Sequence, residues 1–204
     1  MRITILFILS IATSTFLFIA CNSNDKTDKN GDDITKTRAL EGEELVKRGQ
    51  YLVTVGGCND CHSPKNMTQH GPVIDSSRML SGHPSNSPIP EVNPNVLKPG
   101  NWMTMSPDLT AWAGPWGMSF TANLTPDSAT GIGAWSEDVF TKALRTGKHL
   151  GQENGRPILP PMPWEDFAKM TDEDLRAVFA YLRSLPPVSN RVPAPLAPNE
   201  VKTK

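Results

Sequence analysis

The chain has 204 residues, of which 38% are hydrophobic and 20% are charged, and its formal net charge is -1. This length suits one domain with appendages. No nucleic-acid partner is expected, because the chain lacks the excess of Lys and Arg that neutralises phosphates. Its three cysteines form at most one disulfide, which excludes a small scaffold held together by several bridges.

The N-terminal residues differ in composition from the rest of the chain. Residues 3–20 contain no charged residue, proline or glycine, and they follow the basic Arg2. Such a segment is typical of a secretory signal peptide, which we predict over residues 1–20. It is also just long enough to cross a bilayer as an uncleaved anchor. In both cases the chain is expected to be exported and held at a membrane.

Cys21 follows this segment directly. The sequence Phe18-Ile19-Ala20-Cys21 resembles the lipobox of bacterial lipoproteins, although Phe18 replaces the usual branched aliphatic residue. The resemblance implies that Cys21 is acylated and becomes the mature N-terminus, on the periplasmic side of a bacterial membrane. The alternative is a retained helix in which Cys21 is incidental.

The next segment is too polar to fold by itself. Between residues 22 and 41 the apolar residues are Ile34, Ala39 and Leu40 alone. These bury too little surface to offset the entropy of ordering the segment. We therefore predict a flexible tether over residues 21–42.

A helix is predicted to open the folded domain, which we place at residues 43–187. Leu45, Gly49, Leu52 and Val53 recur at helical spacing on one face. The pair Gly56-Gly57 ends the helix.

The most informative motif follows at once, Cys58-Asn59-Asp60-Cys61-His62. Two thiols at this spacing can add to the two vinyl groups of one porphyrin, and the next residue then places an imidazole under the iron. We predict one covalently attached haem c, held by Cys58 and Cys61, with His62 as an iron ligand.

Two other chemistries use paired cysteines. Structural zinc requires four ligands, and His70, His83 and His149 supply no matching pair spacing. A thioredoxin-like redox pair follows a buried strand, whereas this pair follows an amphipathic helix. Both alternatives are therefore disfavoured.

A second helix is predicted near the C-terminus. Thr171 precedes three acidic residues and can cap the helix, because its hydroxyl accepts from free backbone N–H groups while the acids face the positive helix end. Leu175, Val178, Phe179 and Leu182 then form an apolar face, and Pro186-Pro187 ends the run.

Met162 lies in the rigid segment Leu159-Pro160-Pro161-Met162-Pro163-Trp164, shortly before this helix. Prolines on both sides restrict the backbone. Its soft, neutral thioether is a suitable ligand for haem iron and raises the reduction potential. An ordinary apolar methionine is the alternative, and His70, His83 and His149, each expected at the surface, are the fallback ligands.

The order of helix, haem motif, methionine loop and closing helix resembles that of class I c-type cytochromes. The resemblance implies a mostly α cytochrome c fold with long proline-rich loops wrapping one haem, and Met162 as the second axial ligand. It also implies that the last helix packs on the first, with Gly49 permitting close approach near Tyr181. The implied function is transfer of single electrons between redox proteins, without enzymatic activity.

Four further segments resemble one group within this family, the cytochrome domains of periplasmic alcohol and gluconate dehydrogenases. These segments are Asn123–Asp127, Gly131–Ser136, Arg145–Gly147 and Met170–Pro187. Those subunits typically carry three haem motifs, whereas this chain has one. A dehydrogenase and a terminal oxidase are therefore the candidate redox partners. The rival function is a haem enzyme or gas sensor with an open sixth iron position.

Residues 63–120 are expected to be ordered loop, because nine prolines fall between Pro64 and Pro115. We expect the Gly71-Pro72 carbonyl to accept the Nδ1–H of His62. The tryptophans of this region are expected to pack in the core, and the alternative is that the indole N–H of Trp112 or Trp135 reaches a haem propionate. Ser136 is predicted to cap a helix that ends at Gly147, and residues 188–204 are predicted to be a C-terminal tail.

Overall fold

The computed structural model describes residues 39–204. The predicted signal peptide, Cys21 and most of the predicted tether lie outside the described residues.

The helices are α1 (Gly42–Val55), α2 (Cys58–His62), α3 (Glu137–Thr146), α4 (Trp164–Phe167) and α5 (Asp172–Ser184), with short 3-10 helices η1 (Ser76–Arg78), η2 (Pro94–Leu97) and η3 (His149–Gly151). Within residues 39–204, no helix is both long and apolar enough to cross a bilayer.

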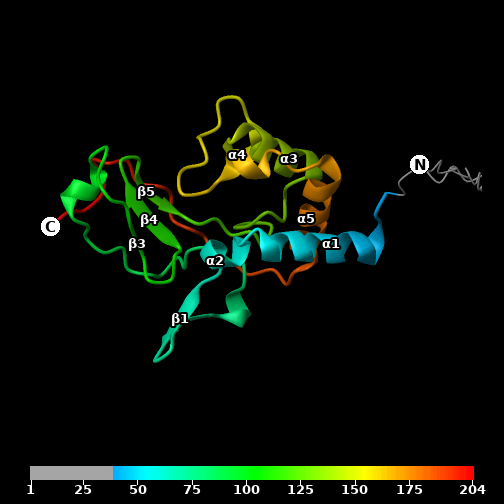
Figure 1. Ribbon diagram of the computed structural model, residues 1–204, viewed down its shortest axis with the longest axis horizontal. Coiled ribbons are helices and arrows are strands. Elements are labelled where there is room, and N and C mark those ends of the chain that lie inside the picture. The colour runs from blue at the N-terminus through cyan, green and yellow to red at the C-terminus, as the bar shows by residue number, and fades with distance from the viewer. Residues whose placement is uncertain (1–38) are drawn as a thin grey trace, which may run out of the picture. The chain divides into compact units, whose positions relative to one another are not determined.

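The first and last helices, α1 and α5, pack against each other (Figure 1). A Cβ on Gly49 would lie 1.9 Å from the Ala177 carbonyl oxygen and 2.8 Å from the Tyr181 Cβ. Only glycine permits this approach, which confirms the expectation that Gly49 lies close to Tyr181. Beside the crossing, the Arg48 guanidinium donates to the Asp174 carboxylate at 2.9 Å.

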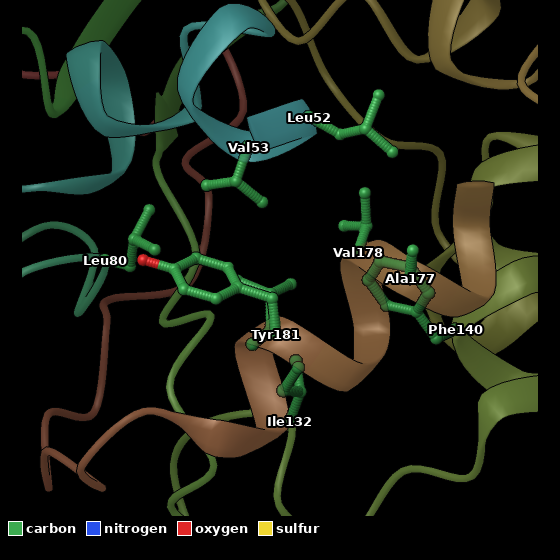
Figure 2. Close-up of a cluster of buried hydrophobic side chains, with 9 residues drawn as sticks. Leu52, Val53, Leu80, Ile132, Phe140, Ala177, Val178 and Tyr181 are labelled. Carbon is green, nitrogen blue, oxygen red and sulfur yellow. The ribbon is translucent and has the colours of Figure 1, made fainter. Parts of the chain in front are cut away.

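A cluster of buried apolar side chains, the first cluster, lies around this crossing. Figure 2 shows Val53 and Leu80 beside the ring of Tyr181, with Leu52 of α1 across from Val178 of α5. Its members are Leu52, Val53, Leu80, Ile132, Phe140, Ala177, Val178, Tyr181 and Leu182. The cluster therefore joins both predicted helices to the loops that follow the haem motif.

The predicted helix ends are confirmed. The Ser136 hydroxyl accepts from the Val139 N–H at 3.2 Å, and α3 stops where Gly147 has φ +65. The Thr171 hydroxyl accepts from the Asp174 N–H at 3.1 Å, as expected for the cap of α5. Helix α1 ends at Val55, directly before the Gly56-Gly57 pair.

The region expected to be loop also contains strands, so the expectation is wrong there. β1 (Lys65–Thr68) and β2 (Gly71–Ile74) form a hairpin, and β3 (Thr104–Met105), β4 (Ala111–Gly114) and β5 (Gly117–Phe120) form an antiparallel sheet in that order. The alanines and glycines of β4 and β5 have weak strand propensity, so strand pairing and burial decide their conformation. In Figure 1 this sheet lies at the opposite end from α3, α4 and α5, with α2 between them.

Residues 188–204 fold against this sheet. Leu196 and Met118 exchange both backbone hydrogen bonds at 2.9 Å, and Val92 forms a parallel bridge with Thr203. Val201 is buried in a second cluster with Val92, Ala113 and Met118. The segment predicted as a tail thus extends the sheet, as the red C-terminal trace beside β4 and β5 in Figure 1 shows.

Candidate haem-binding site

The haem motif forms the one-turn helix α2, which the glycine pair positions. Gly57 has φ +66, a conformation that L side chains rarely adopt, and its carbonyl accepts from the Asp60 N–H at 2.9 Å. The chain thereby turns from α1 into α2. Cys58 and Cys61 are three residues apart on this turn and so share one face. Neither forms a disulfide.

Both thiols have a raised pKa. Burial raises the pKa of Cys58 to about 11. Burial also raises the pKa of Cys61, against a lowering contribution from Lys65. A reactive thiolate in a redox-active cysteine pair requires a lowered pKa. The raised pKa values of Cys58 and Cys61 therefore disfavour that alternative.

His62 has the orientation that an iron ligand needs. It is 9% exposed, and its Nδ1 lies 2.8 Å from the Ala122 carbonyl oxygen. A carbonyl oxygen only accepts, so Nδ1 carries the proton and Nε2 keeps its lone pair for a metal. Burial lowers the pKa of His62, which favours the neutral imidazole.

The acceptor is thus Ala122, and the expectation of Gly71-Pro72 is wrong. Gly71 and Pro72 begin β2, where they pair with Thr68 and Met67 in the hairpin. Ala122 follows β5 in sequence and is sixty residues from His62. The sequence gives no local signal for such a distant backbone contact.

Asn123 fixes the segment that supplies this carbonyl. Its side-chain N–H groups donate to the Val188 carbonyl at 2.8 Å and the Thr130 hydroxyl at 3.2 Å. Its Oδ1 accepts from the N–H and hydroxyl of Thr125 at 2.9 and 2.7 Å. Asn123 is 4% exposed, so these bonds are shielded from water. Asn123 thus holds the Ala122 carbonyl in place beside His62, a role that the segment Asn123–Asp127 does not reveal in the sequence.

Replacing Asn123→Ala is expected to lower the free energy of unfolding by about 2 kcal/mol, because buried partners lose their hydrogen bonds. It should also shift the reduction potential of the haem, because the Ala122 carbonyl is no longer held against His62. Urea denaturation and a redox titration measure these effects. The control is Asn66→Ala, at an exposed position of β1. Equal effects of the two substitutions would contradict the positioning role.

Met162 lies on a segment separate from α2, between η3 and α4, drawn in yellow in Figure 1. It is half-buried, and its N–H donates to the Leu159 carbonyl at 3.4 Å. The Ser119 hydroxyl donates to the neighbouring Pro160 carbonyl at 2.6 Å, which connects this segment to β5. The structure therefore brings Cys58, Cys61 and His62 together on one helix, while ligation by Met162 stays a prediction.

The other histidines and tryptophans differ from several expectations. His83 was expected at the surface but is 3% exposed. His149 and His70 are exposed, as expected, and the ring of His149 lies edge-on to Trp135 with centroids 5.8 Å apart. The Trp112 indole donates to the Leu109 carbonyl at 2.8 Å, so that N–H already has a protein partner. Among residues 39–204, no three or more His, Cys, Asp or Glu side chains are grouped so that they could hold a metal ion.

Comparison with known proteins agrees with this geometry. The family model for cytochrome c matches residues 46–186. The chain is 33% identical over 139 residues to the gluconate 2-dehydrogenase cytochrome c subunit of Pantoea cypripedii, covering 68% of this chain and 23% of that protein. It is 29% identical over 154 residues to the cytochrome c subunit of alcohol dehydrogenase (quinone) from Gluconobacter oxydans, covering 75% and 24%.

A third relative is the fructose dehydrogenase cytochrome subunit of Gluconobacter japonicus. The identity is 33% over 146 residues, which cover 72% of this chain and 22% of that protein. The chain therefore spans about a quarter of the length of these curated relatives.

Proposed function

The chain belongs to the cytochrome c family, and from this premise we propose that it is a membrane-tethered carrier with one haem c that passes single electrons between periplasmic redox proteins. The observation that carries the proposal is the set of groups on α2. The free Cys58 and Cys61 thiols share one face, and the Nδ1 of the adjacent His62 lies 2.8 Å from the Ala122 carbonyl oxygen, which leaves Nε2 as the ligand atom. A haem bound there supplies an iron that gains and loses one electron at a time.

Each residue of the site has a separate task. The Cys58 and Cys61 thiols would hold the haem through two thioether bonds, each formed by addition of S–H across a vinyl double bond. His62 would supply Nε2 as an iron ligand, while the Ala122 carbonyl fixes its ring. Met162 would supply a thioether ligand, which favours the reduced state. With His62 and Met162 both bound to the iron, the chain would carry electrons and would not itself transform a substrate.

The proposed partners are proteins. The relatives are dehydrogenase cytochrome subunits by their names. We therefore place a dehydrogenase as electron donor and a terminal oxidase or another redox protein as acceptor. Redox encounters use small, short-lived contacts. Tethering makes such short encounters more frequent, because confinement at the membrane raises the effective concentration of each partner.

Replacing Met162→Ala is expected to lower the reduction potential by about 0.1 V or more, within the range of roughly 0.8 V that haem axial ligands span. The weak long-wavelength thioether-to-ferric band should disappear. The matched control is Met103→Ala, at a side chain that is 51% exposed. A band that survives the Met162 substitution would assign the ligand elsewhere.

The rate of carbon monoxide binding distinguishes the proposed electron carrier from the rival haem enzyme or gas sensor. A site with both axial positions filled binds carbon monoxide slowly in the ferrous state, whereas the Met162→Ala variant binds it fast. Fast binding to the unaltered chain would favour a haem enzyme or gas sensor with an open sixth position.

The proposed lipid anchor is tested by Cys21→Ser. This substitution is expected to leave an unprocessed precursor, because acylation of the cysteine precedes cleavage of a lipoprotein signal peptide. Mass spectrometry of the unaltered chain should show an acylated N-terminus at Cys21. An unmodified cysteine in a chain that retains Met1 would instead assign residues 3–20 to a spanning anchor.

A further inference from the structure

Three side chains that carry N–H groups lie close together near η3, the 3-10 helix that follows α3. The rings of Trp135 and His149 meet edge to face with centroids 5.8 Å apart. Lys148 and Pro157 form an antiparallel bridge, and the His149 backbone N–H donates to the Arg156 carbonyl at 2.9 Å. This register puts His149 opposite Arg156, and opposite residues of an antiparallel pair project to the same side. We call Trp135, His149 and Arg156 the donor cluster.

Arg156 has no anionic partner in the protein. Within residues 39–204 its guanidinium forms neither a hydrogen bond nor an ion pair. The other arginines of this part of the chain donate to protein oxygens or, in the case of Arg191, lie close enough to Asp127 to lower the pKa of that carboxyl. Although part of the Arg156 side chain is exposed, burial of the rest lowers its pKa, and no carboxylate raises it. A cation that loses water without gaining an anion costs free energy.

The other two members of the donor cluster also lack partners. The indole N–H of Trp135 and the imidazole of His149 form no hydrogen bond within the described residues. Burial and, to a lesser extent, the charge of Arg156 lower the pKa of His149, so the imidazole is neutral and offers one N–H. The cluster thus combines one positive charge with several N–H donors. A carboxylate fits this set, because a guanidinium binds it through two parallel hydrogen bonds.

The donor cluster adjoins both parts of the proposed haem site. Trp135 and Cys58 pack against the same first cluster of buried side chains. Arg156 precedes Met162 by six residues on one segment. A haem attached to α2 through its vinyl groups carries two propionates at the other edge of the porphyrin, and these propionates are carboxylates.

We propose that the donor cluster binds a haem propionate, with Arg156 as the ionic partner and the N–H groups of Trp135 and His149 as further donors. This assignment rests on the proposed single-haem function and adds the residues that orient the haem. A positive charge held beside the porphyrin disfavours the ferric state, so Arg156 also raises the reduction potential.

The test uses the full-length, haem-loaded chain from cells supplied with aminolevulinate that carries carbon-13 at its carboxyl carbon, the source of the propionate carboxyl carbons. Isotope-edited infrared spectra then identify the propionate bands. Arg156→Gln is expected to shift these bands and to lower the equilibrium constant for reduction about tenfold, which is about 59 mV. Arg156→Lys keeps the charge and should restore most of the potential while the bands stay shifted, because the planar fork is lost. The control is Lys98→Gln, at an exposed position after η2, which should change neither quantity.

A second variant covers the case in which Arg156→Gln does not fold. Trp135→Phe keeps a ring beside His149 but removes the N–H, so it should shift the propionate bands with little change in potential. Propionate bands that stay in place in both variants would overturn the proposal, even if the potential falls, because a charge also acts from a distance. The unaltered chain would then still show its one-electron transition, so the proposed function would stand. A chain without haem absorbance would contradict the proposed function and this assignment together.

Discussion

A Cys58→Ala, Cys61→Ala double variant is expected to carry no haem that survives denaturation, whereas the unaltered chain should keep its haem on a denaturing gel. Cys58 and Cys61 are the two cysteines within residues 39–204, and both lie on α2. Without them, only coordination by His62 and contact with the domain would hold a haem. Haem staining of the gel measures the effect.

The matched control is Cys21→Ser, which removes the third cysteine of the chain and should leave the stain unchanged. A stained double variant would show that the motif is not the attachment point. A chain that instead copurifies with zinc in proportion to these two thiols would revive the metal-site alternative.

Gly49→Ala is expected to lower the free energy of unfolding by about 3 kcal/mol, because the added Cβ would lie 1.9 Å from the Ala177 carbonyl oxygen. Backbone atoms cannot turn aside as a flexible side chain can, so α1 and α5 must separate. The gain in helix propensity from glycine to alanine, about 1 kcal/mol, offsets only part of this cost.

Urea denaturation measures this change, with Gln50→Ala as the control on the exposed side of the same helix. That substitution should change stability by less than about 0.5 kcal/mol. The haem absorbance spectrum should also change in the Gly49 variant, because the crossing supports the first cluster, against which Cys58 of the haem motif packs. Equal stability of the two variants would mean that the helices do not cross at Gly49.

The sequence predicted those parts of the structure that depend on local patterns. The apolar faces of α1 and α5, the Thr171 and Ser136 caps and the glycine pair before the haem motif each act within a few residues, so spacing alone reveals them. The close approach of the two helices at Gly49 is implied by the family resemblance, and the structure confirms it.

Contacts between distant segments were not predictable in this way. The acceptor for His62 is a backbone carbonyl, and any residue type can provide one, so no side chain marks Ala122. The strands of the small sheet are rich in alanine and glycine, and their conformation follows from pairing with one another and with Leu196. His83 resembles any isolated histidine in the sequence, and only the fold reveals its burial and its link to Asp108 through Thr110.

The measurement that tests the central proposal most directly is an optical redox titration of the purified full-length chain, with the haem-to-protein ratio determined on the same sample. We predict one haem per chain and one reversible transition that follows a one-electron Nernst curve and accounts for the whole haem absorbance change. A chain without haem absorbance, or a transition that requires more than one haem per chain, would contradict the proposal of a single-haem electron carrier.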